Sequence, residues 1–383
     1  MDDALTELFD DFDDGRLSRR RLLQALGLAA VGAALPVRVF GQGRCGGRAG
    51  EGACDTIPAR APFDATGWKT VYMDHFTMQA ADYRREAAYY TALMNWTVRS
   101  DDGAKAVLDM GDAGSVVIRG GYQAPPAPPP QAAPAGADSA AGRGRGGRGG
   151  GGQRAPRNVV WDSFCWGIEP WNTGKVEAEL RKRGLNPVRG NDGPGGNEYF
   201  MVTDPGGFTL KISDGSQRHR RGGTGIRLSQ PEPFEHTNWK TLWLDHISFQ
   251  CPNYKASTAF YQALLGWRPT GDEGSQNETE IGDLGNIIIR GGGGARGAAP
   301  GGAPGQGMAR RASIDHIAFG ITPWDTDAVA NELTKRGLSA RPDTGGKGDI
   351  HLAAALYKSY HTTTPNGFDL QISNANKANR TVR

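Results

Sequence analysis

The sequence predicts an α+β protein that is built from four βαβββ modules. Two observations lead to this fold class: one long segment occurs twice, and a different segment that follows each copy also occurs twice. A third observation is that all four segments share one plan, an apolar strand, a helix and three shorter strand candidates. A plan that recurs in this way indicates duplication of a structural unit.

The first repeated segment, the A module, recurs at a constant separation. His75 matches His246 and Tyr90 matches Tyr261, and both 246 − 75 and 261 − 90 give 171. The second repeated segment, the B module, carries Gly-Ile-x-Pro-Trp at residues 167–171 and again at residues 320–324. Each half of the chain therefore consists of an A module followed by a B module.

The helices of the B modules have clear sequence limits. Asn172 and Asp325 are residue types that cap helix N-termini, because their side chains accept hydrogen bonds from the first free amides. An apolar i, i+4 stripe follows in both copies. Each helix then ends in Lys-Arg-Gly, which gives a cationic last turn and a glycine stop at Gly184 and Gly337.

The modules define the expected domain organisation. We expect a signal region at 1–42, a Gly-rich segment at 43–69, a first paired-module domain at 70–217, a connector at 218–240 and a second paired-module domain at 241–376. Two tracts rich in Gly, Pro, Ala and Arg, 123–157 and 291–311, are predicted to be disordered, because they contain too few apolar residues to order themselves. The first resembles an RGG tract, but a solvated loop is the preferred interpretation.

The N-terminus resembles a twin-arginine export signal. Ser18-Arg19-Arg20-Arg21-Leu22-Leu23 precedes an apolar stretch from Ala25 to Leu35, which Pro36 ends. This stretch is too short for a transmembrane helix. We expect export to the periplasm or the extracellular space, and no membrane contact beyond the signal region; a basic amphipathic helix is the alternative.

Charge and cysteine content narrow the class of protein further. The chain has 44 Lys and Arg against 41 Asp and Glu, and its basic residues do not follow one helix face, so no nucleic-acid partner is expected. Cys165 and Cys251 lie in apolar strand patterns and are predicted to be core residues. Cys45 and Cys54 form either a small disulfide loop or two free thiols, and spacing alone leaves both open.

The first strand of every module has two different faces, since side chains alternate along a strand. One face carries bulky pairs that suit packing beneath a helix, namely Phe76/Met78, Phe164/Trp166, Ile247/Phe249 and Ile317/Phe319. The other face carries a histidine or serine and then a small residue, namely His75/Thr77, Ser163/Cys165, His246/Ser248 and His316/Ala318. Small side chains beside a histidine leave room for a ligand.

These modules resemble the vicinal oxygen chelate superfamily of glyoxalases, extradiol dioxygenases and bleomycin-resistance proteins, over about residues 70–215 and 241–374. The resemblance implies that paired modules form two curved open β-barrels, with metal ligands from the first and last strands of each module. Carried over residue by residue, the positions are His75, Ile118, Ser163 and Lys211 in the first half and His246, Ile289, His316 and Gln371 in the second.

Only the second set suits a divalent metal. Two imidazoles and an amide oxygen, from His246, His316 and Gln371, are expected to bind Fe(II), Mn(II) or Zn(II). In the first half a single histidine stands beside the cation of Lys211, so His75 is expected to be structural. We expect the Lys211 side chain either to reach solvent or to form an ion pair.

The C-terminal segment also resembles the extradiol dioxygenase signature, with three departures. The gap after His351 is one residue too long, His361 replaces a tyrosine, and Gln371 replaces a carboxylate ligand. Loss of the carboxylate argues against ring cleavage more than against metal binding, because glutamine is a ligand in some glyoxalases. His361 and His351 are the candidate catalytic acids or bases; for His351 the preferred interpretation is a polar residue at the surface without a catalytic role, and for His361 both interpretations stay open.

The expected function is an exported metal-dependent enzyme, a dioxygenase or lyase, that acts on a small oxygen-rich or aromatic compound. The first alternative is a metal-free protein that binds a small molecule, as in the bleomycin-resistance branch. This alternative predicts a roomy pocket in each half and no convergence of the three proposed ligands. The second alternative is a surface interaction protein that uses the Gly/Pro/Arg tracts as tethers. Assembly into a homo-oligomer stays open.

Overall fold

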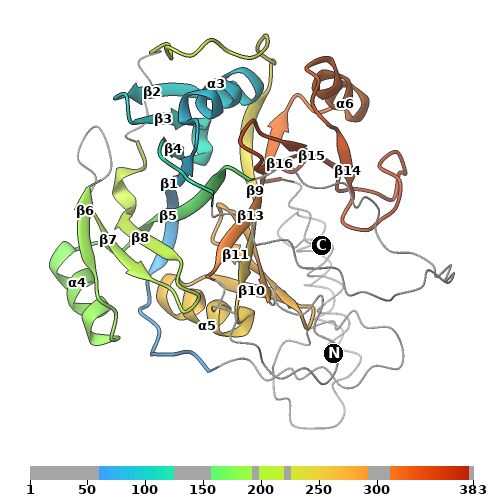
Figure 1. Cartoon of the computed structure of the whole chain (residues 1–383). Coiled ribbons are helices and arrows are strands. Elements are labelled where there is room, and N and C mark those ends of the chain that lie inside the picture. The colour runs from blue at the N-terminus through green and yellow to red at the C-terminus, as the bar shows by residue number, and fades with distance from the viewer. Residues whose placement is uncertain (1–59, 125–156, 192–197, 220–225, 292–310, 379–383) are drawn as a thin grey trace, which may run out of the picture. The chain divides into compact units, whose positions relative to one another are not determined.

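The computed structural model describes residues 60–124, 157–191, 198–219, 226–291 and 311–378 (Figure 1). The twin-arginine segment, Cys45, Cys54 and most of the two Gly/Pro/Arg tracts lie outside these ranges. All the described residues belong to one unit, Gly43–Arg383. Among them, no helix combines the length and the apolar character needed to cross a membrane.

The first half of the chain forms one eight-stranded sheet, in the order β2-β3-β4-β1-β5-β8-β7-β6. Its A module consists of β1 (Lys69–Ala80), α3 (Tyr83–Met94), β2 (Thr97–Asp101), β3 (Lys105–Asp109), the short helix η1 (Gly111–Ala113) and β4 (Ser115–Arg119). Its B module consists of β5 (Val159–Glu169), α4 (Thr173–Lys182), β6 (Val188–Asn191), β7 (Glu198–Thr203), β8 (Thr209–Asp214) and the short helix η2 (Gly215–His219).

The second half repeats this arrangement in a second eight-stranded sheet, in the order β10-β11-β12-β9-β13-β16-β15-β14. Its A module consists of β9 (Lys240–Cys251), α5 (Tyr254–Leu265), β10 (Arg268–Asp272), β11 (Gln276–Ile281) and β12 (Gly285–Gly291). Its B module consists of β13 (Ser313–Thr322), α6 (Thr326–Lys335), β14 (Arg341–Asp343), β15 (Ser359–Thr363) and β16 (Asp369–Ser373).

Each sheet is joined at the first strands of its two modules. These strands, β1 with β5 and β9 with β13, pair antiparallel at the centre of the sheet, and each pairs in parallel with the last strand of its own module. The mixed sheets with few helices confirm the predicted α+β fold of four βαβββ modules. The pairing also brings the first and last strands of both modules side by side, so that residues on all four strands can reach one point.

The predicted limits of the B-module helices are confirmed. The side chains of Asn172 and Asp325 accept hydrogen bonds from the third amides after them, at 3.0 and 2.8 Å, and the helices end at Lys182 and Lys335. Gly184 adopts φ +74°, a left-handed conformation that glycine enters without steric cost.

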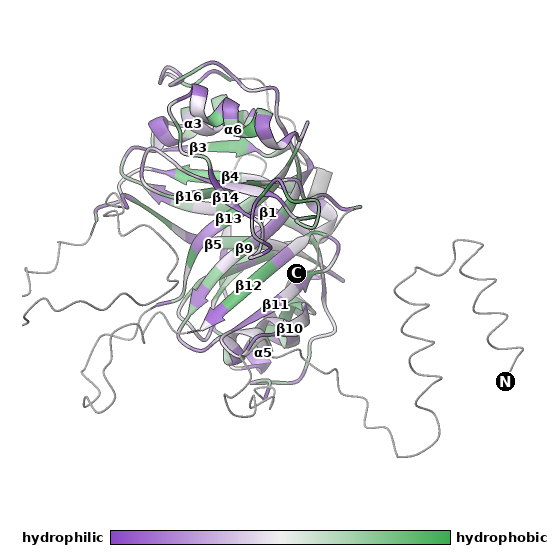
Figure 2. Cartoon of the chain, turned by 90° about the vertical axis from the view of Figure 1, so that its right-hand side faces the viewer, coloured by the Kyte–Doolittle hydropathy of each residue, from purple (hydrophilic) through white to green (hydrophobic). Residues whose placement is uncertain are grey.

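The two faces of the first strands are also as predicted. All eight bulky residues named above are at most 1 % exposed and belong to one core cluster. In Figure 2 the middle of β12 lies at the hydrophobic end of the scale, and its residues Ile287 and Ile289 belong to the same cluster. The opposite face is left to the polar and small residues that form the site.

The two halves contact each other through matched residues. The indole of Trp96 donates to Thr241 Oγ1 at 2.8 Å, and the indole of Trp267 donates to Thr70 Oγ1 at 2.9 Å. Each indole also stacks on a tyrosine of the helix that precedes it, at 4.7 Å between ring centroids. The halves therefore share buried aromatic contacts.

Candidate metal centre

His246 and His316 meet on the polar face of the second sheet. They enter from the paired strands β9 and β13, and their Nε2 atoms lie 3.2 Å apart. Both residues are buried, at 3 % and 7 % exposure. The distance lies within the range of about 3–4.5 Å that is expected between two nitrogen ligands of one metal ion.

An aspartate precedes each of these histidines and contacts its ring at Nδ1, the nitrogen that does not face the other histidine. Asp245 Oδ1 lies 3.4 Å from His246 Nδ1, and Asp315 Oδ2 lies 3.2 Å from His316 Nδ1. The strand register passes over both aspartates, which marks a β-bulge at each position. A bulge lets neighbouring residues turn toward the same side, so each Nδ1 is engaged and each Nε2 faces the other histidine.

Gln371 lies on β16 and is fully buried. Its Nε2 donates to Ser359 Oγ at 2.8 Å and to Tyr357 Oη at 3.0 Å, and lies 3.5 Å from Asp343 Oδ2. Its Oε1 has no hydrogen-bond partner among the described residues. A buried carbonyl oxygen without a partner is costly, and a water molecule, a ligand or an ion could satisfy it.

His361 completes the group on β15. Its ring centroid lies 5.1 Å from that of His316, and its Nδ1 is 3.1 Å from Asp369 Oδ1. Its Nε2 lies 3.6 Å from Asp343 Oδ2. His351, in contrast, is exposed and lies 3.7 Å from Asp327 Oδ1, outside this group.

Burial and the neighbouring carboxylates shift the pKa values of His316 and His361 in opposite directions. Burial lowers the pKa of His316, which favours the neutral ring that a metal ligand must have. Burial also acts to lower the pKa of His361, but the hydrogen bonds and charges of Asp343 and Asp369 outweigh burial and raise this pKa above its ordinary value. Compared with an ordinary histidine, the neutral form is favoured more at His316 and the protonated form more at His361.

The residues carried over from β4 and β12 require a correction. Ile118 and Ile289 lie in the hydrophobic core, because Ile289 pairs with Phe249 on the core face of β9. The residue that pairs with His246 is Asn286, which lies on the polar face. The family resemblance therefore assigned a core residue of β12 to the site, whereas the residue of this strand beside His246 is Asn286.

The equivalent place in the first half contains a buried lysine. Lys211 Nζ lies 3.4 Å from His75 Nε2 and 3.4 Å from Thr77 Oγ1, and the residue is 6 % exposed. The alternative in which this side chain reaches solvent is therefore wrong. Asp74, His75 and Cys165 place one potential metal-binding atom each within 4.8 Å of one another, but the ammonium beside His75 opposes a second cation.

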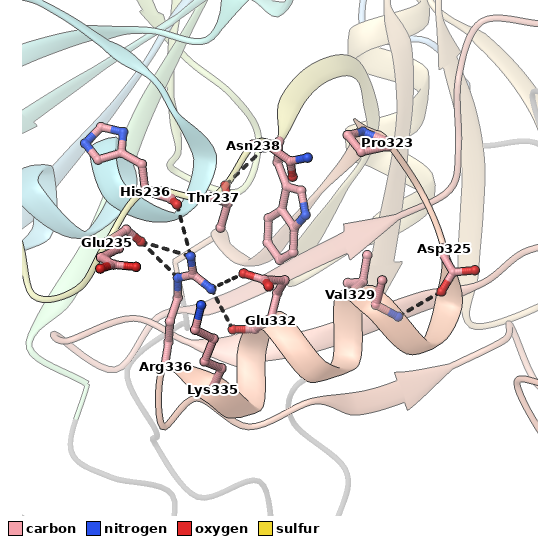
Figure 3. A pocket seen from close by; sticks show the side chains of 12 residues that line it. Glu235, His236, Thr237, Asn238, Pro323, Asp325, Val329, Glu332, Lys335 and Arg336 are labelled. Atoms are coloured by element: carbon pink, nitrogen blue, oxygen red, sulfur yellow. Dashed lines mark hydrogen bonds and ion pairs between the residues drawn. The ribbon is translucent and has the colours of Figure 1, made fainter.

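Two cavities of about 390 Å³ each lie elsewhere, and they are copies of each other. One lies between residues 235–239 and α6, where Arg336 reaches toward the backbone of Glu235 and His236 (Figure 3). The other lies between Trp68 and α4. Neither cavity is lined by His246, His316 or Gln371, so we place the candidate site by its donor atoms instead.

The sequence interpretation missed the residues that support the ligands. Asp245 and Asp315 could have been recognised from the sequence, because Asp-His recurs in three of the four first strands. Tyr357 could not, since it lies in a segment between β14 and β15 without regular periodicity. Ser359 and Asp343 are at strand ends, where their neighbours in space cannot be read from spacing.

The fold is that of the vicinal oxygen chelate proteins, with two pairs of modules. Residues 243–372 match the model of the Glyoxalase/Bleomycin resistance protein/Dioxygenase superfamily. This match includes the candidate site but does not extend to the first half of the chain, for which only the fold is similar. Comparison with curated proteins gives no match.

Solved structures with the same fold include a glyoxalase and dioxygenases. The Mn(II)-bound glyoxalase from Novosphingobium aromaticivorans is 15% identical, with a TM-score of 0.52 over 80% of this chain and 82% of that chain. A variant of homoprotocatechuate 2,3-dioxygenase from Brevibacterium fuscum is 14% identical, with a TM-score of 0.52 over 82% and 73%. The 2,3-dioxygenase LapB from Pseudomonas sp. KL28 is 14% identical, with a TM-score of 0.51 over 80% and 92%. At this identity the similarity establishes the fold only.

Proposed function

We propose that this protein is a divalent-metal-dependent enzyme, a dioxygenase or lyase, that acts on a small oxygen-rich or aromatic compound through its second half. His246, His316 and Gln371 are the proposed ligands of Fe(II), Mn(II) or Zn(II). The observation that carries the proposal is the group of donors itself: two imidazole Nε2 atoms 3.2 Å apart, and a buried amide oxygen without a partner among the described residues. A bound metal ion would chelate adjacent substrate oxygens and stabilise developing negative charge.

The surrounding residues support this use of the donors. Asp245 and Asp315 engage the Nδ1 atoms, so the Nε2 atoms, 3.2 Å apart, are the ring nitrogens that would bind a metal ion. Three ligands leave coordination positions for substrate, as in catalytic metal sites. His361, held between Asp343 and Asp369 and beside His316, is the proposed group that gives a proton to the substrate or takes one from it.

The test is metal content and metal titration of the purified full chain. We expect one ion per chain by elemental analysis, and loss of that ion in His246→Ala and in His316→Ala. His75→Ala is the matched control, since His75 is the equivalent residue in the first half and should leave the stoichiometry unchanged. Circular dichroism would verify that each variant is folded. Absence of stoichiometric metal before and after titration with Mn(II), Zn(II) and anaerobic Fe(II) would falsify the proposal.

The metal-free alternative draws support from the two matched cavities, because a binding protein of this fold was expected to have one pocket in each half. Both cavities adjoin α4 or α6, however, and neither is lined by the proposed ligands. A small molecule that binds with equal affinity to the wild type and to His246→Ala/His316→Ala in the presence of chelator would favour this alternative.

We also propose that the protein works outside the cytoplasm. The support is the arginine run at Arg19-Arg20-Arg21 and the apolar stretch after it. Replacement of these arginines by lysine should retain the protein in the cytoplasm, which fractionation of expressing cells would measure. Unchanged export of the variant would contradict the assignment to the twin-arginine route.

A further inference from the structure

The orientation of the Gln371 amide follows from the protons of its neighbours. The oxygen and nitrogen of a glutamine amide have almost the same shape, so their positions are decided by the hydrogen bonds around them. Two hydroxyls face one end of this amide, Tyr357 Oη at 3.0 Å and Ser359 Oγ at 2.8 Å. Each hydroxyl has one proton to donate, so the direction of that proton settles which end of the amide it meets.

Both hydroxyl protons are directed away from Gln371. Tyr357 donates to Asp245 Oδ2 at 2.7 Å, and Ser359 donates to the backbone carbonyl oxygen of Asp343 at 2.8 Å. An ionised carboxylate and a carbonyl can only accept, so neither bond can be reversed. The two hydroxyl oxygens can therefore only accept from Gln371, and the NH₂ group must face them.

We infer that Asp245, Tyr357 and Ser359 are positioning residues, which fix the Gln371 amide so that its Oε1 is presented as a ligand oxygen. The NH₂ group faces three acceptors, the two hydroxyls and Asp343 Oδ2, and Oε1, at the other end of the amide, has no partner among the described residues. The consequence for metal binding rests on the proposed function, while the orientation of the amide does not.

Asp245 links two of the three proposed ligands. Its Oδ1 contacts His246 Nδ1 at 3.4 Å, and its Oδ2 accepts from Tyr357, which accepts from Gln371. One buried carboxylate thus holds the histidine from β9 directly and the glutamine from β16 through one hydroxyl. Removal of the Tyr357 hydroxyl should break the series of hydrogen bonds between Asp245 and the Gln371 amide without altering either ligand.

The experiment uses Tyr357→Phe and Ser359→Ala in the full chain, with Tyr360→Phe as the matched control. Tyr360 is also buried and lies on the same strand as Ser359, but its ring stacks on Trp324. The first measurement is hydrogen exchange of the Gln371 side-chain amide by NMR of metal-free protein, with the resonance assigned by its loss in Gln371→Leu. The second measurement is the Mn(II) dissociation constant by calorimetry.

We expect protected Gln371 amide protons in the wild type and in Tyr360→Phe, and faster exchange in Tyr357→Phe and Ser359→Ala. The Mn(II) affinity should fall about tenfold in Tyr357→Phe, as for other residues that orient metal ligands. Unchanged exchange and affinity in both variants would overturn the inference. If the wild type binds no metal but its protected amide is released in Tyr357→Phe, the positioning role stands and the proposed function fails.

Discussion

Glu86 is a buried carboxyl group whose negative charge the fold disfavours. It is fully buried in α3, and its Oε2 accepts from the backbone amide and the side-chain amide of Asn366 at 3.2 and 2.8 Å. Burial raises the pKa of this carboxyl above its ordinary value, although hydrogen bonds from Thr364 and Asn366 act to lower it. Its contribution to stability is therefore complete below the unfolded-state pKa and is lost as the pH rises through the folded-state pKa.

We expect Glu86→Gln to weaken this pH dependence. Between about pH 5 and about pH 8, the unfolding free energy of the variant should fall less than that of the wild type, because glutamine has no charge to bury. Urea denaturation at a series of pH values measures the difference. Glu177→Gln is the control, since Glu177 is partly exposed and forms its ion pair with Arg181. If the unfolding free energies of wild type and Glu86→Gln change in the same way with pH, Glu86 does not have a raised pKa in the folded state.

Lys211 gives the first half a fixed positive charge where the second half has Gln371. Its ammonium lies 3.4 Å from His75 Nε2, next to the potential donors Asp74 and Cys165. We expect Lys211→Gln to bind one more divalent ion per chain than the wild type, as measured by calorimetry. Lys211→Arg keeps the charge and should bind no extra ion. Equal stoichiometry in wild type and Lys211→Gln would show that the charge is not what excludes the metal.

Individual site residues could be predicted from the sequence where they recur at matched positions of the modules, and could not be predicted where they do not recur. His246 and His316 could be proposed because they occupy matched positions in paired modules. Ile289 was assigned wrongly, because a bulge at Asp245 shifts the register and puts Asn286 beside His246. Tyr357 could not be proposed, since its contact with Asp245 joins residues that are far apart in the chain.

Helix α6 is anchored at its C-terminus by one arginine. The guanidinium of Arg336 donates to the carbonyls of Glu235, His236 and Glu332 at 2.9–3.1 Å, and its side chain is 4 % exposed. Arg183 anchors α4 in the same way, with bonds to the carbonyls of Asp64 and Ala65. Each arginine thus fixes the segment that leads into the first strand of an A module.

We expect Arg336→Ala to lower the unfolding free energy by about 2–4 kcal/mol, because several carbonyl acceptors lose a charged donor at once. Arg183→Ala should cost a similar amount, and chemical denaturation measures both. Arg181→Ala, which removes an exposed i, i+4 ion pair, should change stability by less than about 0.5 kcal/mol. A cost for Arg336→Ala no larger than that of Arg181→Ala would refute the anchoring role.

For the secondary structure elements, periodicity and capping residues determined most of what could be predicted. The helices α4 and α6 begin after Asn172 and Asp325 because local hydrogen bonds decide helix ends. The first strands were recognised because one face is uniformly apolar. The pairing of the modules was implied by the family resemblance, and the order of the strands was not predicted, because pairing between distant strands leaves no local pattern.

Over the whole described molecule, the two halves are expected to unfold together. Trp267 is 1 % exposed and joins the halves through Thr70, and its ring contacts Trp166 at 5.4 Å. Trp267→Ala should lower the unfolding free energy by about 3–5 kcal/mol and shift a single calorimetric transition to lower temperature. Trp171→Ala, at a partly exposed position, should shift it less. Two separate transitions in the wild type would contradict this coupling.

The contacts between the halves are reciprocal, and this has a consequence for how the chain can vary. Trp96 donates to Thr241 while Trp267 donates to Thr70, and both 241 − 70 and 267 − 96 give 171. In the isologous interface of a twofold-symmetric homodimer, residue i of one subunit contacts residue j of the other, and residue j of the first contacts residue i of the second. The two Trp–Thr contacts follow this pattern. The chain therefore has the layout of a dimer whose subunits have been fused, so that their association no longer depends on concentration. Fusion also allows the two halves to differ in sequence. The second half can hold His316 and Gln371 while the first carries Ser163 and Lys211 at the matching positions, which two copies of a single chain could never do.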